Sequence, residues 1–515
     1  MATVIGFDFG NYNSFPCFIS DFDKGTRMGG IVHDLLPSNQ RLVDGIPSVY
    51  FYSQRVGRVL IGENAVKDSA VPLQNRLRYL KRHLGETKVL DGKTISYDEA
   101  ITEVVQHCIR IANTQLNKGW MMTTNLVSLS YPATYTCAQR QRLIELVEKA
   151  TLEDGRKVEV YGTIAEPAAA ALDYLATFVK SDKDTTVLTY DLGGGTFDLG
   201  LVSVYPKGRK NSEGKTYYYD IINTRGLEKL GGAEFDEVMF RLLQGKINVT
   251  LNQNNTEKLR NLAETTKIEL SDSDEAFPQL YVGDEFIDMH VTRGEFERAS
   301  AGLLKQTIEE TRKILVEHKN QQPELILLTG GASQMPMVQK ELEKAFPQFK
   351  NKIACYRPSR AIAYGAARFG TSESNTDPGI TSGADSIVQQ RVMYDIGVKY
   401  LDKQGTNYIF TFIKAGTPIP CVSNIEPSSQ SKAGESTVFR VFEARGSSPV
   451  KTEITRDYRE IMSVTVNFGK VVPEGHPHEA RMTVDKNGVL YIEARDASIP
   501  NLRFERARKQ LENLS

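Results

Sequence analysis

The sequence is poor in the features that mark several broad classes of protein. Its five cysteines are widely spaced, without the close pairs that a disulfide framework or a zinc site needs. Acidic and basic residues nearly cancel, and the net charge of −1 argues against nucleic acid or anionic lipid as a bulk electrostatic partner. No apolar run approaches the roughly 18 residues of a membrane-spanning helix. We therefore expect reduced thiols, and neither a nucleic-acid nor a membrane partner.

The composition is otherwise that of a globular protein with a sizeable core. Hydrophobic residues make up 40% of the chain and charged residues 25%, which are ordinary values for a soluble protein. A length of 515 residues favours about three domains. The N-terminus enters a strand-like segment at Thr3 without a basic and then apolar leader, so we expect a cytoplasmic location.

One stretch of strand, aspartate and glycines is typical of a site for a metal-bound polyphosphate. The apolar run from Val187 to Tyr190 predicts a buried strand that delivers Asp191 to its end. Gly193, Gly194 and Gly195 let the backbone approach an anion closely, while the carboxylate suits a hydrated cation. The three glycines alone are equally compatible with an ordinary hairpin.

The same arrangement occurs near the start of the chain. Residues 3–8 predict a short strand that ends in Asp8, and Gly10 begins a turn of small polar residues. Residues 15–19 then predict a return strand. Two copies of this pattern are far rarer by chance than one, so we predict two related lobes, each with an aspartate and a phosphate-facing turn.

Two predicted helices have distinctive N-termini, and the second of them is suited to an anion. Glu166 and Pro167 start one helix, with the proline at its first position. Gly231 and Gly232 precede another. Taken singly, Glu166 is better explained as an acid that complements the helix dipole.

Two more segments are compatible with a nucleoside site. Glu264, Lys267 and Ser271 share one face of a predicted helix, where they are able to bind a ribose or a base. In isolation, a surface ion pair is the better explanation of them. Residues 325–329 predict a third strand that runs into Gly330 and Gly331.

The amino-acid composition and the hydrophobic pattern of the chain change near residue 370. Residues 371–390 are rich in small and polar residues and predict a linker. Residues 391–503 predict a compact antiparallel β domain, because apolar and polar residues alternate in several short runs and an Asn-Gly turn joins the last two. Residues 504–515 resemble the beginning of a helix.

With these motifs assembled, the chain resembles the 70-kDa heat-shock chaperone (DnaK-like) family over nearly its full length. Five motifs match in order: residues 5–10 and 191–198 resemble two phosphate motifs, 166–170 a lobe-connecting motif, 231–236 a nucleotide-contacting motif and 328–331 the adenosine motif. The resemblance implies an α/β plus all-β fold. Residues 1–370 would form an actin-like, two-lobed (ribonuclease H-like) ATPase domain, 391–503 a β-sandwich peptide-binding domain, and 504–515 the start of a truncated or absent helical lid.

The resemblance also implies roles for single residues. The catalytic set would be Asp8, Lys81, Glu166, Asp191 and Thr196, with Lys81 contacting the γ-phosphate and orienting the attacking water. Mg²⁺ would be held through water molecules by Asp8 and Asp191, with K⁺ near Asp8 and Asp198. The remaining nucleotide-binding residues would be Gly10, Asn11, Tyr12, Asn13, Gly193, Gly194, Gly195, Gly231, Gly232, Glu264, Lys267, Ile268, Ser271, Gly330, Gly331, Ala332, Ser333 and Gln334.

In the β domain, four residues are candidates for a pocket that holds an extended peptide. They are Val398, Leu401, Thr437 and Phe439. Ordinary sandwich core is the better explanation of each one singly.

Several positions depart from the family pattern. Asn11 and Tyr12 stand where members usually carry two threonines that reach toward the transferred phosphate. Ile268 replaces an arginine that stacks on adenine, a loss of about 0.5–2 kcal/mol of binding. Gln334 also replaces an arginine, and Ser359 replaces an acid.

Other departures concern partners. Gly162, Ala165 and Ala168 occupy positions where members present Arg, Asn and Thr near the J-domain docking surface. In the linker, Ile387 and Val388 alone keep the usual apolar character. The J-domain co-chaperone and the nucleotide exchange factor therefore stay open as partners.

These observations favour a monomeric, ATP-dependent chaperone that binds and releases extended apolar segments of unfolded proteins, coupled to hydrolysis of ATP to ADP and phosphate. Two alternatives remain. Asn11 and Ile268 are compatible with an ATP-binding scaffold or holdase that hydrolyses little. An actin-fold small-molecule kinase would leave the β domain unexplained.

Overall fold

The computed structural model describes most of the chain from residue 3 to residue 506. The segments outside the described residues are 1–2, 21–29, 38–44, 55–56, 68–74, 180–181, 212–213, 215, 284, 375–387, 402–406, 429–432, 445–450, 454–457, 475, 477, 499–504 and 507–515. In the ranges that are described, no helix is long and apolar enough to cross a membrane.

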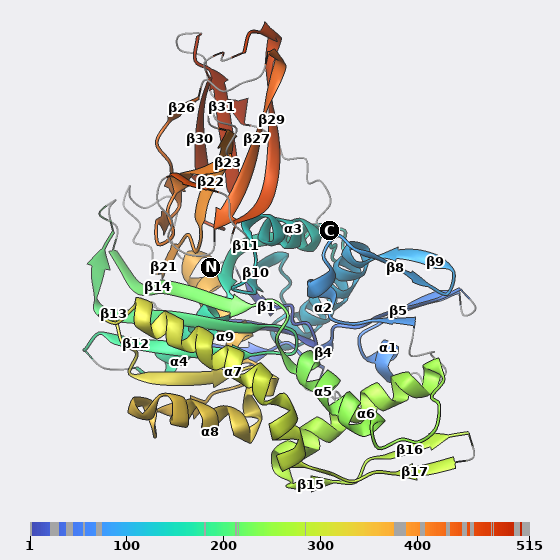
Figure 1. Ribbon diagram of the computed structural model, residues 1–515. Coiled ribbons are helices and arrows are strands. Elements are labelled where there is room, and N and C mark those ends of the chain that lie inside the picture. Colours follow the sequence, from blue (N-terminus) through green and yellow to red (C-terminus); the bar gives the residue numbers. More distant parts are fainter. Residues whose placement is uncertain are drawn as a thin grey trace. The chain divides into compact units, whose positions relative to one another are not determined.

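The chain divides into two compact units. The first comprises Met1–Thr134, Leu146–Asp220 and Thr224–Ile387, and the second comprises Tyr135–Glu145, Ile221–Asn223 and Val388–Ser515. The first unit mixes helices and sheets, whereas strands dominate the second (Figure 1).

One sheet of the first unit carries the Asp8 turn. Its strands are β1 (Ile5–Asp8), β2 (Asn13–Ser20), β3 (Ile31–Asp34), β10 (Leu126–Tyr131) and β11 (Glu159–Ala165), with β4 (Ile46–Pro47) paired to β2. The order is β11-β10-β1-β2-β3. The central strand β1 is fully buried and runs parallel to β10, so it delivers Asp8 to one edge of the sheet, where β2 turns back beside it.

A second sheet repeats this plan around the Asp191 turn. Its strands β12 (Thr185–Leu192), β13 (Phe197–Lys210), β14 (Thr216–Leu227), β19 (Leu325–Thr329) and β20 (Ile353–Cys355) follow the order β20-β19-β12-β13-β14 in the first unit. The strand β12 runs parallel to β19 and antiparallel to β13. The duplication expected from the two strand–aspartate–glycine patterns is therefore present as two sheets of the same local design.

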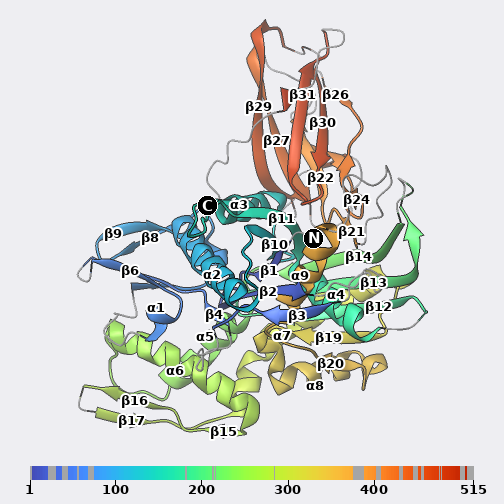
Figure 2. The same ribbon diagram turned by 180° about the vertical axis from the view of Figure 1, so that it is seen from behind.

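Two helices, α4 (Glu166–Phe178) and α9 (Ala361–Ser374), pack against each other, and both views show them side by side (Figures 1 and 2). The helix α9 covers β1, β2, β10 and β11, while α4 covers β12 and β13. Small residues bring the helices close: a Cβ on Gly365 would lie 1.8 Å from the carbonyl oxygen of Ala169. The contact between the two sheets is thus made through two closely packed helices.

The other helices of the first unit surround this core. They are α1 (Glu63–Lys67), α2 (Tyr97–Trp120), α5 (Gly232–Gln244), α6 (Gln253–Asp272), α7 (Arg293–Glu317) and α8 (Pro336–Ala345), with the short 3-10 helices η3 (Leu80–His83), η4 (Gly331–Gln334) and η5 (Pro347–Phe349). The short strands are β5 (Tyr50–Ser53), β6 (Arg58–Ile61), β7 (Arg76–Leu77), β8 (Thr87–Leu90), β9 (Lys93–Ser96), β15 (Glu275–Ala276), β16 (Gln279–Val282), β17 (Glu285–Asp288) and β18 (Val291–Thr292).

The second unit contains two antiparallel sheets. One has the order β28-β23-β22-β27-β29 and the other β25-β30-β31-β32, with β26 paired to β30. The strands are β21 (Val388–Arg391), β22 (Asp395–Leu401), β23 (Asn407–Ile413), β24 (Pro418–Ile419), β25 (Cys421–Val422), β26 (Glu426–Ser428), β27 (Gly434–Ala444), β28 (Lys451–Glu453), β29 (Tyr458–Val472), β30 (His478–Val484), β31 (Leu490–Asp496) and β32 (Glu505–Arg506).

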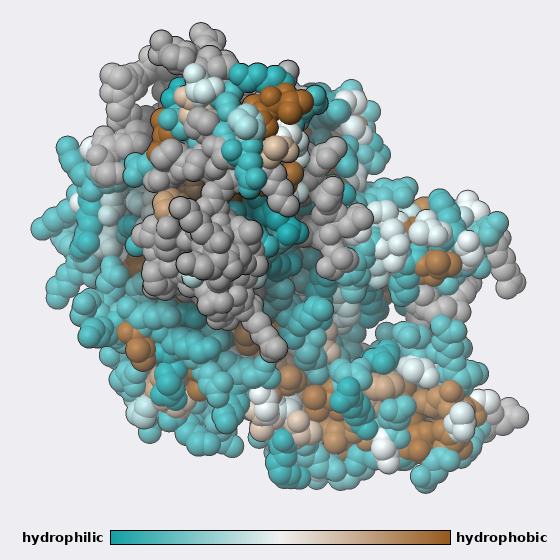
Figure 3. Space-filling view, turned by 45° about the horizontal axis from the view of Figure 1, so that its top comes forward, coloured by the Kyte–Doolittle hydropathy of each residue, from teal (hydrophilic) through white to brown (hydrophobic). Residues whose placement is uncertain are grey.

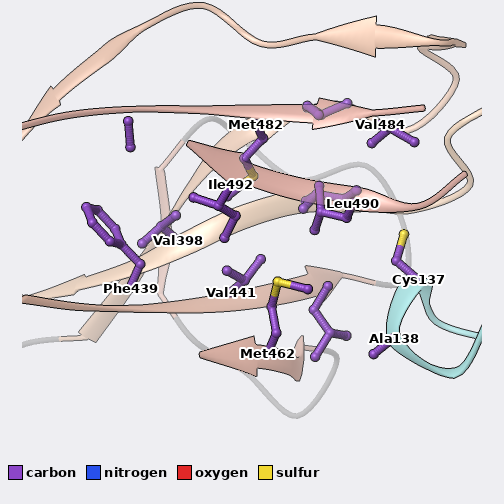
Figure 4. Close-up of a cluster of buried hydrophobic side chains, with 14 of the residues drawn as sticks. Cys137, Ala138, Val398, Phe439, Val441, Met462, Met482, Val484, Leu490 and Ile492 are labelled. Atoms are coloured by element: carbon purple, nitrogen blue, oxygen red, sulfur yellow. The ribbon is translucent and has the colours of Figure 1, made fainter. Parts of the chain in front are cut away.

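One buried hydrophobic cluster draws on both sheets of the second unit. Val441, Met482 and Ile492 lie in it, as do Cys137 and Ala138 at the start of α3 (Cys137–Glu148) (Figure 4). The alternation of apolar and polar residues in 391–503 therefore produces strands with one face turned to a shared core.

Two sequence expectations differ from the structure at the ends of this region. Residues 371–374, assigned to the linker, continue α9 to Ser374, and Val388 already begins β21, because their backbone groups find helix and strand partners. Glu505 and Arg506 pair with β31 as a strand, where a helix was expected. The remaining residues of 504–515 lie outside the described residues.

Candidate functional site

A cavity of about 430 Å³ in the first unit lies where the two aspartate turns meet. The turns are in contact, since a Cβ on Gly194 would lie 3.3 Å from the Cβ of Tyr12. The surface is open between the part that carries β8 and β9 and the part that carries α6, at the right of Figure 3. The site is therefore a cleft that two similar halves build.

Most residues predicted for a nucleotide site line this cavity. They are Asp8, Gly10, Asn11, Tyr12, Asn13, Lys81, Glu166, Asp191, Gly193, Gly194, Gly195, Thr196, Gly232, Glu264, Lys267, Ile268, Ser271, Gly330, Gly331, Ala332 and Gln334. Seven sequence segments that span more than 320 positions of the chain thus converge on one space.

Three predicted residues lie behind the cavity wall. Ser333 is buried, and its hydroxyl accepts a hydrogen bond from the Leu192 N–H at 3.1 Å, so it supports β12. Gly231 packs against the backbone of Gly195, where a Cβ would approach to 2.7 Å. Asp198 is fully buried on β13, directly opposite Asp191 in the sheet register. These positions support the site from beneath its surface.

The side chains of Lys81 and Glu166 form a buried ion pair beside the aspartates. Lys81 comes from η3 and Glu166 is the first residue of α4. Burial alone lowers the pKa of Lys81, but the attraction of Glu166 and Asp8 outweighs it and raises the pKa. The lysine is therefore a permanent positive charge in the cavity, held by a carboxylate that is also at the site.

Carboxylates outnumber cations in this buried region. Burial, and then repulsion from Glu166, raise the pKa of Asp8 to about 7 and that of Asp198 to about 7. Burial also raises the pKa of Asp191 well above its ordinary value. The Ser130 hydroxyl donates to Asp8 at 2.9 Å and offsets only part of this effect. Such a cluster favours a bound cation.

The cluster fits a hydrated Mg²⁺ better than a directly coordinated ion. Among the described residues, no three acidic, histidine or cysteine side chains converge closely enough to hold a metal directly. Asp191 Oδ1 is buried and accepts no hydrogen bond from any described residue. Because Mg²⁺ usually retains several waters, Asp8 and Asp191 suit it through water-mediated contacts.

The Asp191 turn also fits a phosphate. The N–H groups of Gly194 and Gly195 donate to no acceptor in the described part of the chain. The sequence suggested that the N-terminus of α5 offers its N–H groups to an anion, but those of Gly232 and Ala233 donate to the carbonyl oxygens of Gly193 and Gly194 at 2.8 and 2.9 Å. The N-terminus of α5 thus stabilises the Asp191 turn through these two hydrogen bonds.

Arg82 joins the two halves of the cleft. Its guanidinium donates to the Gly195 carbonyl oxygen through Nε at 2.8 Å, and to both carboxylate oxygens of Glu234 at 2.8 and 2.7 Å. Glu234 in turn accepts from the Gly231 N–H at 2.8 Å. The residue next to Lys81 therefore fixes the opposing phosphate turn, a role that the basic character of the segment alone did not indicate.

At the nucleoside end of the cavity, two of the predicted residues are in ion pairs. Arg78 lies 3.3 Å from Glu264, and Lys267 lies 2.7 Å from Asp236. Both residues are thus in ion pairs, but they are buried at the cavity wall and do not form the surface pair of the alternative. Ile268 lies at the cavity wall with 56% of its surface exposed.

The structure adds cavity residues that the sequence did not single out. They are Phe15, Tyr79, Asp236, Asp272, Met335, Pro358 and Ile362. Asp236 ends a motif that was noted, and Tyr79 lies two residues before Lys81. Pro358 and Ile362 carry no local signal, since they reach the site only through the packing of α9.

Two of the candidate peptide-pocket residues belong to the core of the second unit. Val398 and Phe439 are buried in its hydrophobic cluster, labelled in Figure 4. Thr437 is partly exposed on β27, and Leu401 ends β22. The sandwich-core explanation is thus correct for Val398 and Phe439.

A comparison with protein-family models supplies the family. The model described as Hsp70 protein matches residues 86–509 of the chain. The chain belongs to the Hsp70 family. Members of this family are ATP-dependent chaperones that bind ATP or ADP with Mg²⁺, and their general partners are unfolded peptides, J-domain proteins and exchange factors. The match extends over parts of both units and includes every cavity residue from Glu166 onward, whereas the Asp8 turn and Lys81 precede it.

Proposed function

We propose that this protein is a chaperone that hydrolyses ATP in the cavity of its first unit and uses the nucleotide state to control its grip on extended, apolar peptide segments. The observation that carries the proposal is the convergence of two duplicated aspartate turns, a buried lysine and a cluster of carboxylates in one cleft within an Hsp70-family chain.

The residues suffice for phosphoryl transfer to water. This reaction needs positioning and charge neutralisation more than a nucleophilic side chain. Lys81, the N–H groups of Gly194 and Gly195, and Mg²⁺ near Asp8 and Asp191 would neutralise the phosphate oxygens. Glu166 would orient water near the metal, and Thr196 lines the same cavity.

The β sheets of the second unit would hold the peptide by main-chain hydrogen bonds and apolar pockets. Nucleotide-dependent closure of the cleft would bias the segment that leads to Val388 and so alter the grip on the peptide. We also propose a cytoplasmic location and a monomeric state.

A second candidate function rests on Asn11. Its side-chain amide is buried at the phosphate turns, close to Gly195, and its Oδ1 accepts no hydrogen bond from a described residue. An amide in this place lacks the hydroxyl of the family's usual threonine. A scaffold that binds ATP and hydrolyses it little is therefore the alternative.

Single-turnover hydrolysis of bound ATP, with and without an unfolded peptide, separates the two functions. The proposal expects Lys81→Ala and Asp191→Asn to be at least about tenfold slower than the wild-type protein, since each removes charge stabilisation at the transferred phosphate. Peptide should accelerate only the wild type. A wild-type rate equal to that of Lys81→Ala would instead support the scaffold.

A further inference from the structure

A buried ion network lies between α4 and α9, outside the cavity. Asp173 of α4 is completely buried, and Arg368 of α9 donates through Nε to its Oδ1 at 2.7 Å. Its Oδ2 accepts from the Tyr356 hydroxyl at 2.8 Å and from Arg357 Nη1 at 3.1 Å. The carboxylate of Asp173 thus accepts hydrogen bonds from three side chains, all of them more than 180 positions further along the chain.

This network is placed where the two sheets meet. Arg368 stands on the helix that covers the Asp8 sheet, and Asp173 on the helix that covers the Asp191 sheet. Charges buried in this way are held in one geometry, because any separation leaves an uncompensated charge in a low-dielectric interior. A relative movement of the two helices therefore has to stretch or break the pair.

Both helices lead directly to side chains of the cavity. Glu166 precedes Asp173 by seven residues, about two helical turns, so the two side chains project from similar faces of α4. On the other side, α9 touches β1 without a gap: a Cβ on Gly6 would lie 2.3 Å from the Ala367 nitrogen. Gly6 is two residues from Asp8 on the same strand.

The network also reaches the nucleoside end of the cavity. Tyr356 and Arg357 follow β20 and immediately precede Pro358, which lines the cavity and accepts the Gly330 N–H at 3.0 Å. The ring of Tyr356 packs edge-on against Tyr174 of α4 at 5.3 Å. The nucleoside end of the cavity and α4 are thus joined through the carboxylate of Asp173.

We propose that Asp173, through Arg368, is a positioning residue that sets the separation of Glu166 and Asp8 and thereby the affinity of the site for Mg²⁺-bound nucleotide. The inference rests on the proposed function for the identity of the ligand. It assigns no chemical step to Asp173, which does not line the cavity.

The test measures the affinity for fluorescent ADP in EDTA and in Mg²⁺, together with the melting temperature, for Arg368→Gln, Arg368→Lys and the control Arg110→Gln. Arg110 is matched because it donates to the Thr151 carbonyl oxygen at 2.9 Å, on α2 and away from the cavity. We expect Arg368→Gln to bind ADP without Mg²⁺ within about threefold of the wild-type affinity. The factor by which Mg²⁺ increases this affinity (the Mg²⁺ gain) should fall by about tenfold, since breaking a buried ion pair has at least a tenfold effect. Arg368→Lys should recover most of this gain, and Arg110→Gln should leave it unchanged.

An unchanged Mg²⁺ gain in Arg368→Gln overturns the proposal, as does an equal loss of Mg²⁺-free and Mg²⁺-bound affinity. If Arg368→Gln does not fold, Tyr356→Phe replaces it, with an expected loss of about threefold in the Mg²⁺ gain from one hydrogen bond. Because ADP binding is measured without turnover, a wild-type protein that hydrolyses no ATP contradicts the proposed function while leaving this result intact.

Discussion

Asp8 shows how the burial of a single carboxyl group in the cavity makes the stability of the protein depend on pH. Its folded-state pKa of about 7 lies above the ordinary value, chiefly because of burial. The folded protein therefore holds a proton that the unfolded chain has released, and without Mg²⁺ its stability falls as the pH rises from about 4 to above 7. We expect Asp8→Asn to raise the melting temperature in EDTA by a few degrees at about pH 8, and by little at about pH 5.

The measurement is thermal unfolding in EDTA at both pH values, repeated with Mg²⁺ and ADP. With ligand the order should reverse, because the variant loses a group that the cation needs. Asp154→Asn is the control, since Asp154 is exposed and its pKa is lowered by hydrogen bonds from Arg156. A variant that is less stable than wild type in EDTA at the higher pH would contradict the interpretation.

Asn11 is the residue that we expect to limit the rate of ATP hydrolysis. The resemblance of residues 5–10 to a phosphate motif implies a hydroxyl at this place in the family, and the Asn11 amide lies against Gly195 in the opposing turn. We expect Asn11→Thr to speed single-turnover hydrolysis by about 3- to 10-fold, as a hydroxyl replaces the amide at the transferred phosphate. Affinity for ADP should change little, and a slower or unchanged rate in a folded variant would show that this position does not limit hydrolysis.

At the scale of elements, the packing of α4 on α9 leaves no room for a side chain at Gly365. A Cβ there would lie 1.8 Å from the Ala169 carbonyl oxygen, so Gly365→Ala has to separate the helices. We expect this change to cost about 1–3 kcal/mol or more in the free energy of unfolding. Denaturant unfolding measures it.

Gly302 provides the matched control. It lies within α7, and a Cβ at this position meets no atom within 4 Å. Gly302→Ala should therefore stabilise the protein by about 0.5–1 kcal/mol, the ordinary helix preference for alanine. Equal effects of the two substitutions would show that the helices separate without cost.

The same elements show what a sequence can reveal. The Asp8 and Asp191 turns were predictable because strand, carboxylate and glycine follow one another locally, and the structure has them where the pattern indicates. The Asp173–Arg368 pair was not, since its members are 195 positions apart and neither has a distinctive neighbourhood. The N-terminus of α5 was misjudged because its N–H acceptors come from another segment, the Asp191 turn.

For the whole molecule, alternation within strands was enough to predict a β domain in residues 391–503. It was not enough to tell a peptide pocket from a core, because both require apolar residues with the same spacing. Val398 and Phe439 are buried in the cluster of the second unit, and their side chains are more than 90% covered. Burial of this kind depends on how two sheets face each other, which no single strand encodes.

Along the chain, the first unit ends at Ile387 and the second resumes at Val388, where we expect nucleotide and peptide binding to be coupled. Val388 begins β21 after the described end of α9, and its side chain is 4% exposed. A charge placed there would have to be hydrated, which opposes the packing of β21. We expect Val388→Asp to keep the basal single-turnover rate within about twofold and to lose the acceleration by peptide, because the cavity residues are untouched and the connection is altered. Val388→Ile, which keeps the apolar character, should retain the acceleration. If Val388→Asp binds peptide normally and is still accelerated as much as wild type, nucleotide and peptide are not coupled through this strand.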